Sequence, residues 1–272
     1  MIAACVFVYF FVQHGQIDLF SGATDRADRQ EEAVTFNFQH AAIPEEVVSG
    51  EPLTVREVAE SVGAEAINIC HVPFRSTEFG QIQVDQSDAQ RECFPNKNVW
   101  LALVSSMFLH AGLLHLGGNM LFLWVFGNNV EDRLGVFKFL LFYALSGIVA
   151  SGAHILVQPH SAIPVLGASG AIAGVMGAYL VWFPNVPIRT LIIFFLIFIR
   201  DIEAKWLLGF WFVLQFFTNP NEGVAWVAHV GGFVFGVLVA LLMRTAGPAR
   251  PAVLPPDRAP PGGFRSSDDW RW

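Results

Sequence analysis

A series of long apolar stretches in the second half of the chain restricts the fold more than any other feature. Residues 136–157 and 224–243 each reach the roughly 20 apolar residues that a helix needs to cross a bilayer. Only 14% of all residues are charged, whereas soluble domains carry about 25%. An outer-membrane barrel would instead show segments of about 10 residues with alternating polarity, and that pattern is absent. We therefore predict an all-α polytopic membrane protein.

The apolar segments predict six membrane-spanning helices joined by polar loops. The first span is expected within residues 1–20, and the other five within residues 100–243. One of these helices should run from about residue 113 to residue 126, where the sequence GNNVEDR ends the apolar run. Near the end of the chain, RDIEAK interrupts a long apolar segment. We therefore predict a span over residues 204–217 and an apolar loop in or near the membrane over residues 188–199.

A polar segment, residues 21–99, separates the first span from the rest. Residues 18–97 hold fifteen of the 23 acidic residues and six lysines and arginines, so this long first loop is acidic. The sequence LTVREVAESV (53–62) is a candidate helix, and the remainder is predicted to be loop with turn residues. Cys70 and Cys93 either form a disulfide or remain reduced, because spacing alone does not decide between the two. The segment is expected to be an extramembrane insertion.

The distribution of charge predicts how the chain is oriented. Basic residues gather near three predicted loops or ends, and such residues favour the cytoplasmic side: Arg133, Lys138, Arg189, Arg200, Lys205 and Arg244. Residues 244–272 are rich in Pro and Arg, cannot bury a core, and are expected to be a disordered cytoplasmic tail. With a net charge of −7 and no basic stripe, the chain is not expected to bind nucleic acid. We expect an integral protein of a bacterial plasma membrane.

Two polar residues within the apolar spans, Ser169 and His229, are the first candidates for a functional site, because polar groups in lipid are costly and often functional. Ser169 follows Gly167 and begins an apolar helix, where a tight turn exposes a hydroxyl near unpaired backbone N–H groups. Serine also serves close helix packing, and a histidine can bond a neighbouring helix for stability. Both structural roles stay open for these residues taken singly.

A pattern of small residues connects the two candidates. Gly170 and Gly174 are four residues apart, as are Gly232 and Gly236, and such pairs let two helices approach until their backbones nearly touch. Packing these two faces together would bring the imidazole of His229 toward the Ser169 hydroxyl. A base beside a serine makes it a nucleophile. The sequence therefore predicts a Ser–His dyad, with no acidic third residue in the spans.

His115 and Asn119 complete the candidate site. They lie four residues apart and share one helix face, and an imidazole N–H and an amide are suitable donors to an oxyanion. Alternatively, the two could bond each other and cap a helix end. His110, His115 and His229 are also possible metal ligands, but no carboxylate or cysteine lies nearby in the sequence to complete the set. We predict neither a metal nor a cofactor.

Four blocks of this sequence resemble the rhomboid family of intramembrane serine proteases. The blocks are FLHAGLLHLGGNM (108–120), FGNNVEDRLG (126–135), GASGAIAGVMGAY (167–179) and AHVGGFVFG (228–236). The resemblance implies a six-helix bundle in which Ser169 is the nucleophile and His229 the base. It also implies that His115, Asn119 and the Ser169 backbone amide stabilise the oxyanion.

The resemblance further implies the substrate and how it enters. The substrate would be a membrane protein whose transmembrane helix is cut near its outer end. Water would reach the site through a polar cavity under residues 218–225, and the helix with Trp211 and Phe212 would be a lateral gate. The partners expected are transmembrane substrates and the lipid bilayer, and the oligomeric state is left open.

Two positions depart from the pattern of the family. Leu101 follows Trp100 where many members carry Arg, and Ala173 stands where some members place an aromatic residue that stacks on the base. What orients His229 is therefore open. The alternative function is a non-proteolytic binder of client membrane helices, although such proteins typically lose the serine or the histidine. A transporter that relays protons would show inverted repeats, and none is found.

Overall fold

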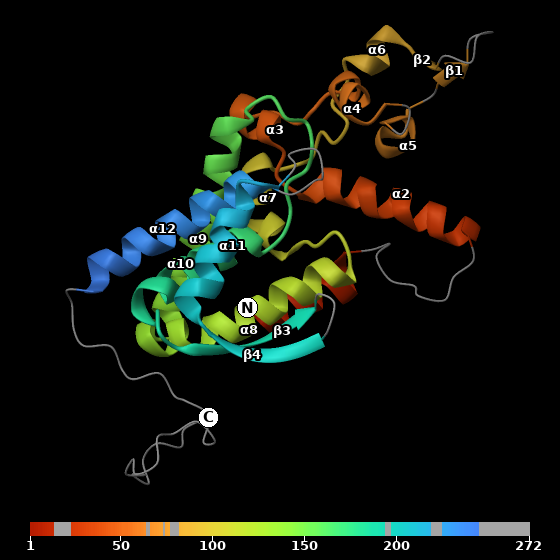
Figure 1. Ribbon diagram of the computed structural model, residues 1–272. Helices are drawn as coiled ribbons and strands as arrows, with labels where there is room; N and C mark the ends of the chain where they lie inside the picture. The colour runs from red at the N-terminus through yellow and green to blue at the C-terminus, as the bar shows by residue number, and fades with distance from the viewer. Residues whose placement is uncertain are drawn as a thin grey trace, which may run out of the picture.

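The computed structural model describes residues 1–13, 23–63, 66–72, 74–76, 82–193, 197–218 and 225–244. Within these residues the chain is mostly helical, and a smaller part, made by the insertion before residue 99, sits at one end of a bundle of apolar helices (Figure 1). Three predictions fall wholly or partly outside the described residues: the disordered tail beyond residue 244, the second half of the first span (residues 14–20), and most of the loop over residues 218–225.

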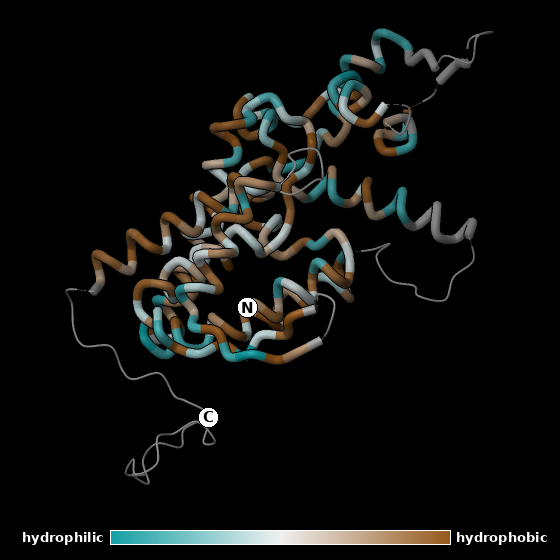
Figure 2. Tube along the Cα trace, in the orientation of Figure 1, coloured by the Kyte–Doolittle hydropathy of each residue, from teal (hydrophilic) through white to brown (hydrophobic). Residues whose placement is uncertain are grey.

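The bundle consists of long apolar helices and shorter pieces joined to them. Its helices are α1 (Ile2–Phe7), the π-helical turn η1 (Val8–Val12), α7 (Val99–Ser105), the 3-10 turn η3 (Ser106–Phe108), α8 (Leu113–Leu134), α9 (Val136–Val157), α10 (Ser169–Trp182), α11 (Ala204–Gln215) and α12 (Trp226–Arg244). Hydrophobic residues run along most of α12, whereas α2 and α6 of the insertion carry hydrophilic stretches (Figure 2).

Two of the described helices are long and apolar enough to cross a membrane. They are α9, with a mean hydropathy of 1.9, and the Trp226–Met243 part of α12, with a mean hydropathy of 2.1. The segment Val99–Phe108 and α8 meet at an angle of 78° and would make a third span if counted together. The apolar helices Ile2–Val12 and α10 are shorter. The predicted number of six spans is therefore not confirmed within the described residues.

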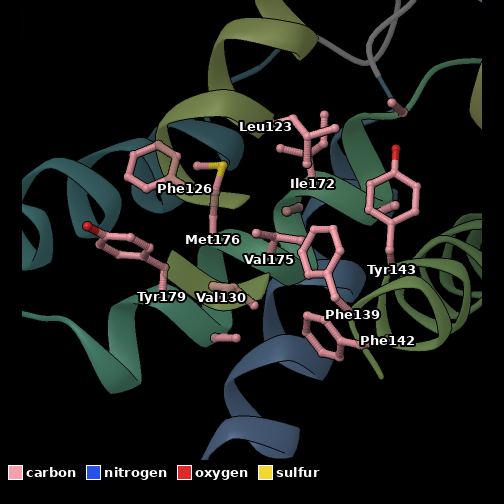
Figure 3. Close-up of a cluster of buried hydrophobic side chains, with 14 of the residues drawn as sticks. Leu123, Phe126, Val130, Phe139, Phe142, Tyr143, Ile172, Val175, Met176 and Tyr179 are labelled. Atoms are coloured by element: carbon pink, nitrogen blue, oxygen red, sulfur yellow. The ribbon is translucent and has the colours of Figure 1, made fainter. Parts of the chain in front are cut away.

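Helix α10 lies at the centre of the bundle and is almost entirely buried. Its side chains Ile172, Val175, Met176 and Tyr179 interdigitate with buried residues of α8 and α9 (Figure 3). A helix that is apolar on every side belongs in the interior of a protein or of a membrane. This central position fixes the start of α10, at Ser169, relative to the neighbouring helices.

The helix expected to end near residue 126 continues to Leu134. Leu123, Val130 and Leu134 are buried, and together with Phe126 they keep the helical spacing through the sequence GNNVEDR. The prediction was wrong because packing of this apolar face against α10 outweighs the weak helix propensity of Gly and Asn. The helix ends where Gly135 adopts a φ of 78°.

A β-hairpin replaces the apolar loop predicted over residues 188–199, so the chain is not all-α. Strand β3 (Pro187–Ile193) pairs antiparallel with β4 (Ile197–Glu203). Both strands are rich in isoleucine, which favours a pleated backbone, and Arg189 Nε lies 3.5 Å from Asp201 Oδ1 of the opposite strand. The hairpin lies at the opposite end of the bundle from the insertion (Figure 1). Helix α11 then begins at residue 204, as predicted, and ends at residue 215.

The segment predicted to be mostly loop forms a small subdomain with its own core. Its elements are α2 (Ala23–His40), α3 (Pro44–Ser49), α4 (Val55–Val62), α5 (Ala66–Cys70), β1 (Phe74–Ser76), β2 (Ile82–Val84) and α6 (Gln86–Ala89). The predicted helix at residues 53–62 is confirmed as α4, where Thr54 and Glu57 form a capping box. The loop prediction was wrong because Phe38, Ile43 and Leu53 bury a shared core with α4. Cys70 and Cys93 form a disulfide.

A buried ion pair fastens this subdomain to the chain that enters the bundle. Lys97 Nζ lies 2.5 Å from Glu46 Oε2 of α3, and both side chains are 1% exposed. The ammonium also donates to the Phe38 carbonyl oxygen, and the carboxylate accepts from the Leu53 N–H. Burial raises the pKa of Glu46 and lowers the pKa of Lys97, while their mutual attraction opposes both shifts.

The subdomain also contacts the loop that leads to Ser169. Ala42 pairs with Val165 in an isolated β-bridge, in which the Val165 N–H donates to the Ala42 carbonyl oxygen. The Ala42 N–H donates to Ser106 Oγ of η3 at 2.6 Å, and the Glu45 N–H donates to the Ser161 carbonyl oxygen at 3.2 Å. Backbone hydrogen bonds therefore connect the insertion to the loop over residues 161–167.

Replacing Lys97 tests how strongly the ion pair holds the subdomain. We expect Lys97→Met to lower the free energy of unfolding by about 3–5 kcal/mol, because it leaves a buried carboxylate without its counter-charge. The double variant Glu46→Gln/Lys97→Met removes both charges and keeps an acceptor for the Leu53 N–H, so it should recover much of the loss. Thermal unfolding in detergent measures both. Equal Tm values for the single variant and the unchanged chain would contradict the expectation.

Candidate active site

Two residues before Ser169, the backbone conformation and the lack of space allow only glycine, and Gly167 stands there. Gly167 has a φ of 122°, which side chains other than glycine rarely adopt. A Cβ built on it would lie 2.9 Å from Cε1 of His115. Ser169 is the first residue of α10, so its backbone N–H has no acceptor within the helix. The turn thus presents the hydroxyl and an N–H at the same point.

His229 of α12 lies beside the serine. Its Nε2 is 2.8 Å from Ser169 Oγ. Two close contacts between backbones set this approach: a Cβ on Gly232 would collide with the Gly170 carbonyl oxygen, and one on Gly236 would collide with the Gly174 carbonyl oxygen. The four glycines singled out in the sequence therefore lie where α10 and α12 meet.

A residue that the sequence analysis missed holds the other nitrogen of this histidine. Nδ1 of His229 lies 2.8 Å from Oε1 of Gln215, the last residue of α11. The Gln215 side chain is buried, and its Nε2 donates to the Trp211 carbonyl oxygen at 3.0 Å. The rule that singles out polar residues within apolar spans could have found Gln215. Its position at the end of a span, however, also fits an ordinary interfacial residue.

His115 and Asn119 lie on the face of α8 that is directed to the serine turn. The Ala111 N–H donates to Nδ1 of His115 at 3.3 Å, so the proton of the neutral imidazole is on Nε2, the atom that packs against Gly167. Asn119 is 7% exposed, and in the described part of the chain its Nδ2 has no hydrogen-bond acceptor. The Nε2–H of His115 thus lies at the serine turn, and the Asn119 amide is a second buried donor on the same face of α8.

Three of the predicted site residues, Ser169, His229 and His115, line a common cavity. The cavity has a volume of about 480 Å³, and Ser169, His229, His115 and His154 contribute to its wall. The Trp211 ring of α11 lies 5.8 Å from the His229 ring. Residues 219–224, most of the loop predicted to cover a water-filled entrance, lie outside the described residues.

The histidines proposed as alternative metal ligands do not assemble into a metal site. His110 and His115 are ring neighbours, with centroids 5.3 Å apart. Among the described residues, no group of three or more His, Cys, Asp or Glu side chains is placed to hold a metal ion.

Comparison with known sequences adds the family. The sequence model of the rhomboid domain matches residues 97–246, which is more than half of the chain. The chain belongs to the rhomboid family. The matched part includes every residue of the candidate site, from His115 to His229.

Individual relatives match the same half of the chain. Rhomboid protease GluP of Bacillus subtilis is 36% identical over 147 residues, which cover 52% of this chain and 25% of GluP. The rhomboid protein YdcA of the same organism is 35% identical over 149 residues, covering 53% of this chain and 67% of YdcA. Rhomboid protease GlpG of Yersinia pestis is 29% identical over 137 residues, covering 50% and 46%. The chain thus spans a quarter of GluP and about half of GlpG.

Two glycine substitutions test whether the α10–α12 contact sets the geometry of the site. We expect Gly236→Val to push the helices apart, because a side chain there meets the Gly174 backbone, and to lower the free energy of unfolding by about 1–3 kcal/mol or more. The control is Gly152→Ala on α9, where a Cβ meets no atom within 4 Å. Thermal unfolding in detergent compares the two. A Tm for Gly236→Val as high as that for Gly152→Ala would contradict the packing argument.

Proposed function

We propose that the protein is an intramembrane serine endopeptidase that hydrolyses peptide bonds in or near the transmembrane segments of other proteins. The observation that carries the proposal is the 2.8 Å separation of Ser169 Oγ and His229 Nε2 at the wall of a cavity between apolar helices. Membership of the rhomboid family and relatives named as rhomboid proteases support it.

The catalytic dyad would work in two stages. Nε2 of His229 accepts the Ser169 hydroxyl proton as Oγ attacks the scissile carbonyl carbon, and the resulting imidazolium then donates that proton to the leaving amine. The acyl-enzyme that remains is hydrolysed by a water molecule, which His229 deprotonates in turn. Neither stage requires a cofactor.

The oxyanion formed in each stage would be stabilised by neutral donors. We assign this role to the Ser169 backbone N–H, Nε2–H of His115 and the amide of Asn119. The positive end of the α10 helix dipole would point toward the same oxyanion. Donors that are already fixed before the reaction are effective because they need no reorganisation when charge develops.

The arrangement in the membrane is part of the proposal. It comprises a first span within residues 1–20, an extramembrane insertion over residues 21–99, a catalytic core with five further spans over residues 100–243, and a cytoplasmic tail over residues 244–272. Basic residues near the span ends support an active site that opens to the extracytoplasmic side of a bacterial plasma membrane. The transmembrane substrate would enter beside α11, which carries Trp211 and Phe212.

A binder of client membrane helices without proteolytic activity is the second candidate. Such a binder needs an apolar surface for the client helix but neither a nucleophile nor a base. The hydrogen bond between Ser169 and His229, together with the buried amide of Asn119, favours the protease, because a binder gains nothing from these costly polar groups.

Cleavage of a model transmembrane substrate in liposomes tests the dyad. We expect Ser169→Ala and His229→Ala each to reduce kcat by at least about a thousandfold, because each removes one half of a unit that acts together. Labelling by a fluorophosphonate should be lost in the serine variant. A folded wild-type chain that neither labels nor cleaves, yet binds transmembrane peptides, would instead support the client binder.

Asn119 tests the oxyanion site separately. We expect Asn119→Ala to lower kcat by roughly 10²-fold with little change in KM, since the amide would bond the oxyanion and not the ground-state carbonyl. Asn119→Asp, of nearly equal size but with a charge that repels the oxyanion, should be at least as impaired. An increase in KM alone would contradict the assignment and indicate a role in binding.

A further inference from the structure

We propose that Gln215 is a positioning residue for His229: it holds the imidazole in the tautomer and orientation that present Nε2 to Ser169. The inference rests on the proposed serine protease function. It assigns to a neutral amide on α11 the place that a carboxylate takes in a Ser–His–Asp triad.

The donors and acceptors around Gln215 permit one arrangement only. The Trp211 carbonyl oxygen can only accept, so the Gln215 group that faces it at 3.0 Å must be the NH₂. Oε1 therefore faces His229, and an amide oxygen can only accept. The proton of the neutral imidazole must then be on Nδ1.

The position of this proton determines whether Nε2 can act as a base. With its proton on Nδ1, the imidazole has a free lone pair on Nε2, the atom 2.8 Å from Ser169 Oγ. The opposite tautomer would place a proton between the two atoms and leave the base unable to accept one. The hydrogen bond also resists rotation of the ring about its Cβ–Cγ bond, so Nε2 stays directed at the serine.

The surroundings of Gln215 suit a neutral group. The side chain is 7% exposed and lies beside Trp211, whose ring is also close to His229. A carboxylate buried there would lose its hydration, whereas the amide accepts one hydrogen bond and donates another at a much lower cost. Because Gln215 belongs to α11, the orientation of the base depends on the position of this helix.

Three variants test the inference by cleavage and by labelling. We expect Gln215→Leu to lower kcat and the rate of fluorophosphonate labelling by roughly fivefold to tenfold, with KM unchanged, because one neutral hydrogen bond is lost. Gln215→Glu keeps an acceptor for Nδ1–H and should retain more of both rates than Gln215→Leu, while its buried carboxylate lowers the Tm. Gln90→Leu, the same replacement at an exposed site of the insertion, is the matched control and should retain the full rates.

Nitrogen-15 spectra of histidine-labelled protein test the tautomer without any substrate. The His229 signals, identified by their loss in His229→Ala, should show a protonated Nδ1 and an unprotonated Nε2 in the wild type. Gln215→Leu should show a mixture of tautomers. A wild-type His229 with its proton on Nε2 would overturn the inference, as would a Gln215→Leu variant that labels and cleaves at the full rate. If the proposed function fails, the wild type cleaves nothing, and the spectra still decide the tautomer on their own.

Discussion

The close contact between α10 and α12 is the constraint on which the site depends. Within lipid, no hydrophobic effect drives two apolar helices together, so their association relies on van der Waals packing and interhelical hydrogen bonds. Gly170 and Gly174 provide the first by letting the facing helix approach to backbone distance. Ser169 and His229 provide an interhelical hydrogen bond at one end of the same α10–α12 contact. The packing that holds the bundle together thus also sets the distance between Ser169 and His229, the proposed nucleophile and base.

The site is a chain of neutral hydrogen bonds in which each group fixes the next. The Trp211 carbonyl oxygen orients Gln215, Gln215 orients His229, and His229 faces Ser169. On the other side, the Ala111 N–H directs the Nε2–H of His115 toward the serine turn. A buried charge that is not fully paired is expensive in low dielectric. A network of this kind avoids that expense in the resting state, and in the proposed reaction charge would develop only as Ser169 attacks.

The sequence was sufficient to predict features that depend on neighbouring residues. It was insufficient for features that depend on packing between segments far apart in the chain. Ser169 and His229 stand out because each is a polar residue in an apolar run. The glycines stand out because they repeat at helical spacing. Gln215 carries no such pattern, and only the meeting of α11 with α12 reveals its partner. The hairpin at residues 187–203 was mistaken for a loop because its apolar residues fit either state. The insertion was mistaken for loops because its core joins residues far apart in the chain.

The insertion bears on the candidate site through the loop that precedes Ser169. The Val165 N–H donates to Ala42 of the insertion, and the Gly167 N–H donates at 2.8 Å to the Ser106 carbonyl oxygen of η3, whose hydroxyl accepts from the same Ala42. One residue of the insertion, Ala42, thus bonds both segments that hold the serine turn. Since Gly167 also packs against His115, a shift of this loop would change the positions of Ser169 and His115 together. The geometry of the site therefore depends on contacts with the insertion as well as on the helices that surround it.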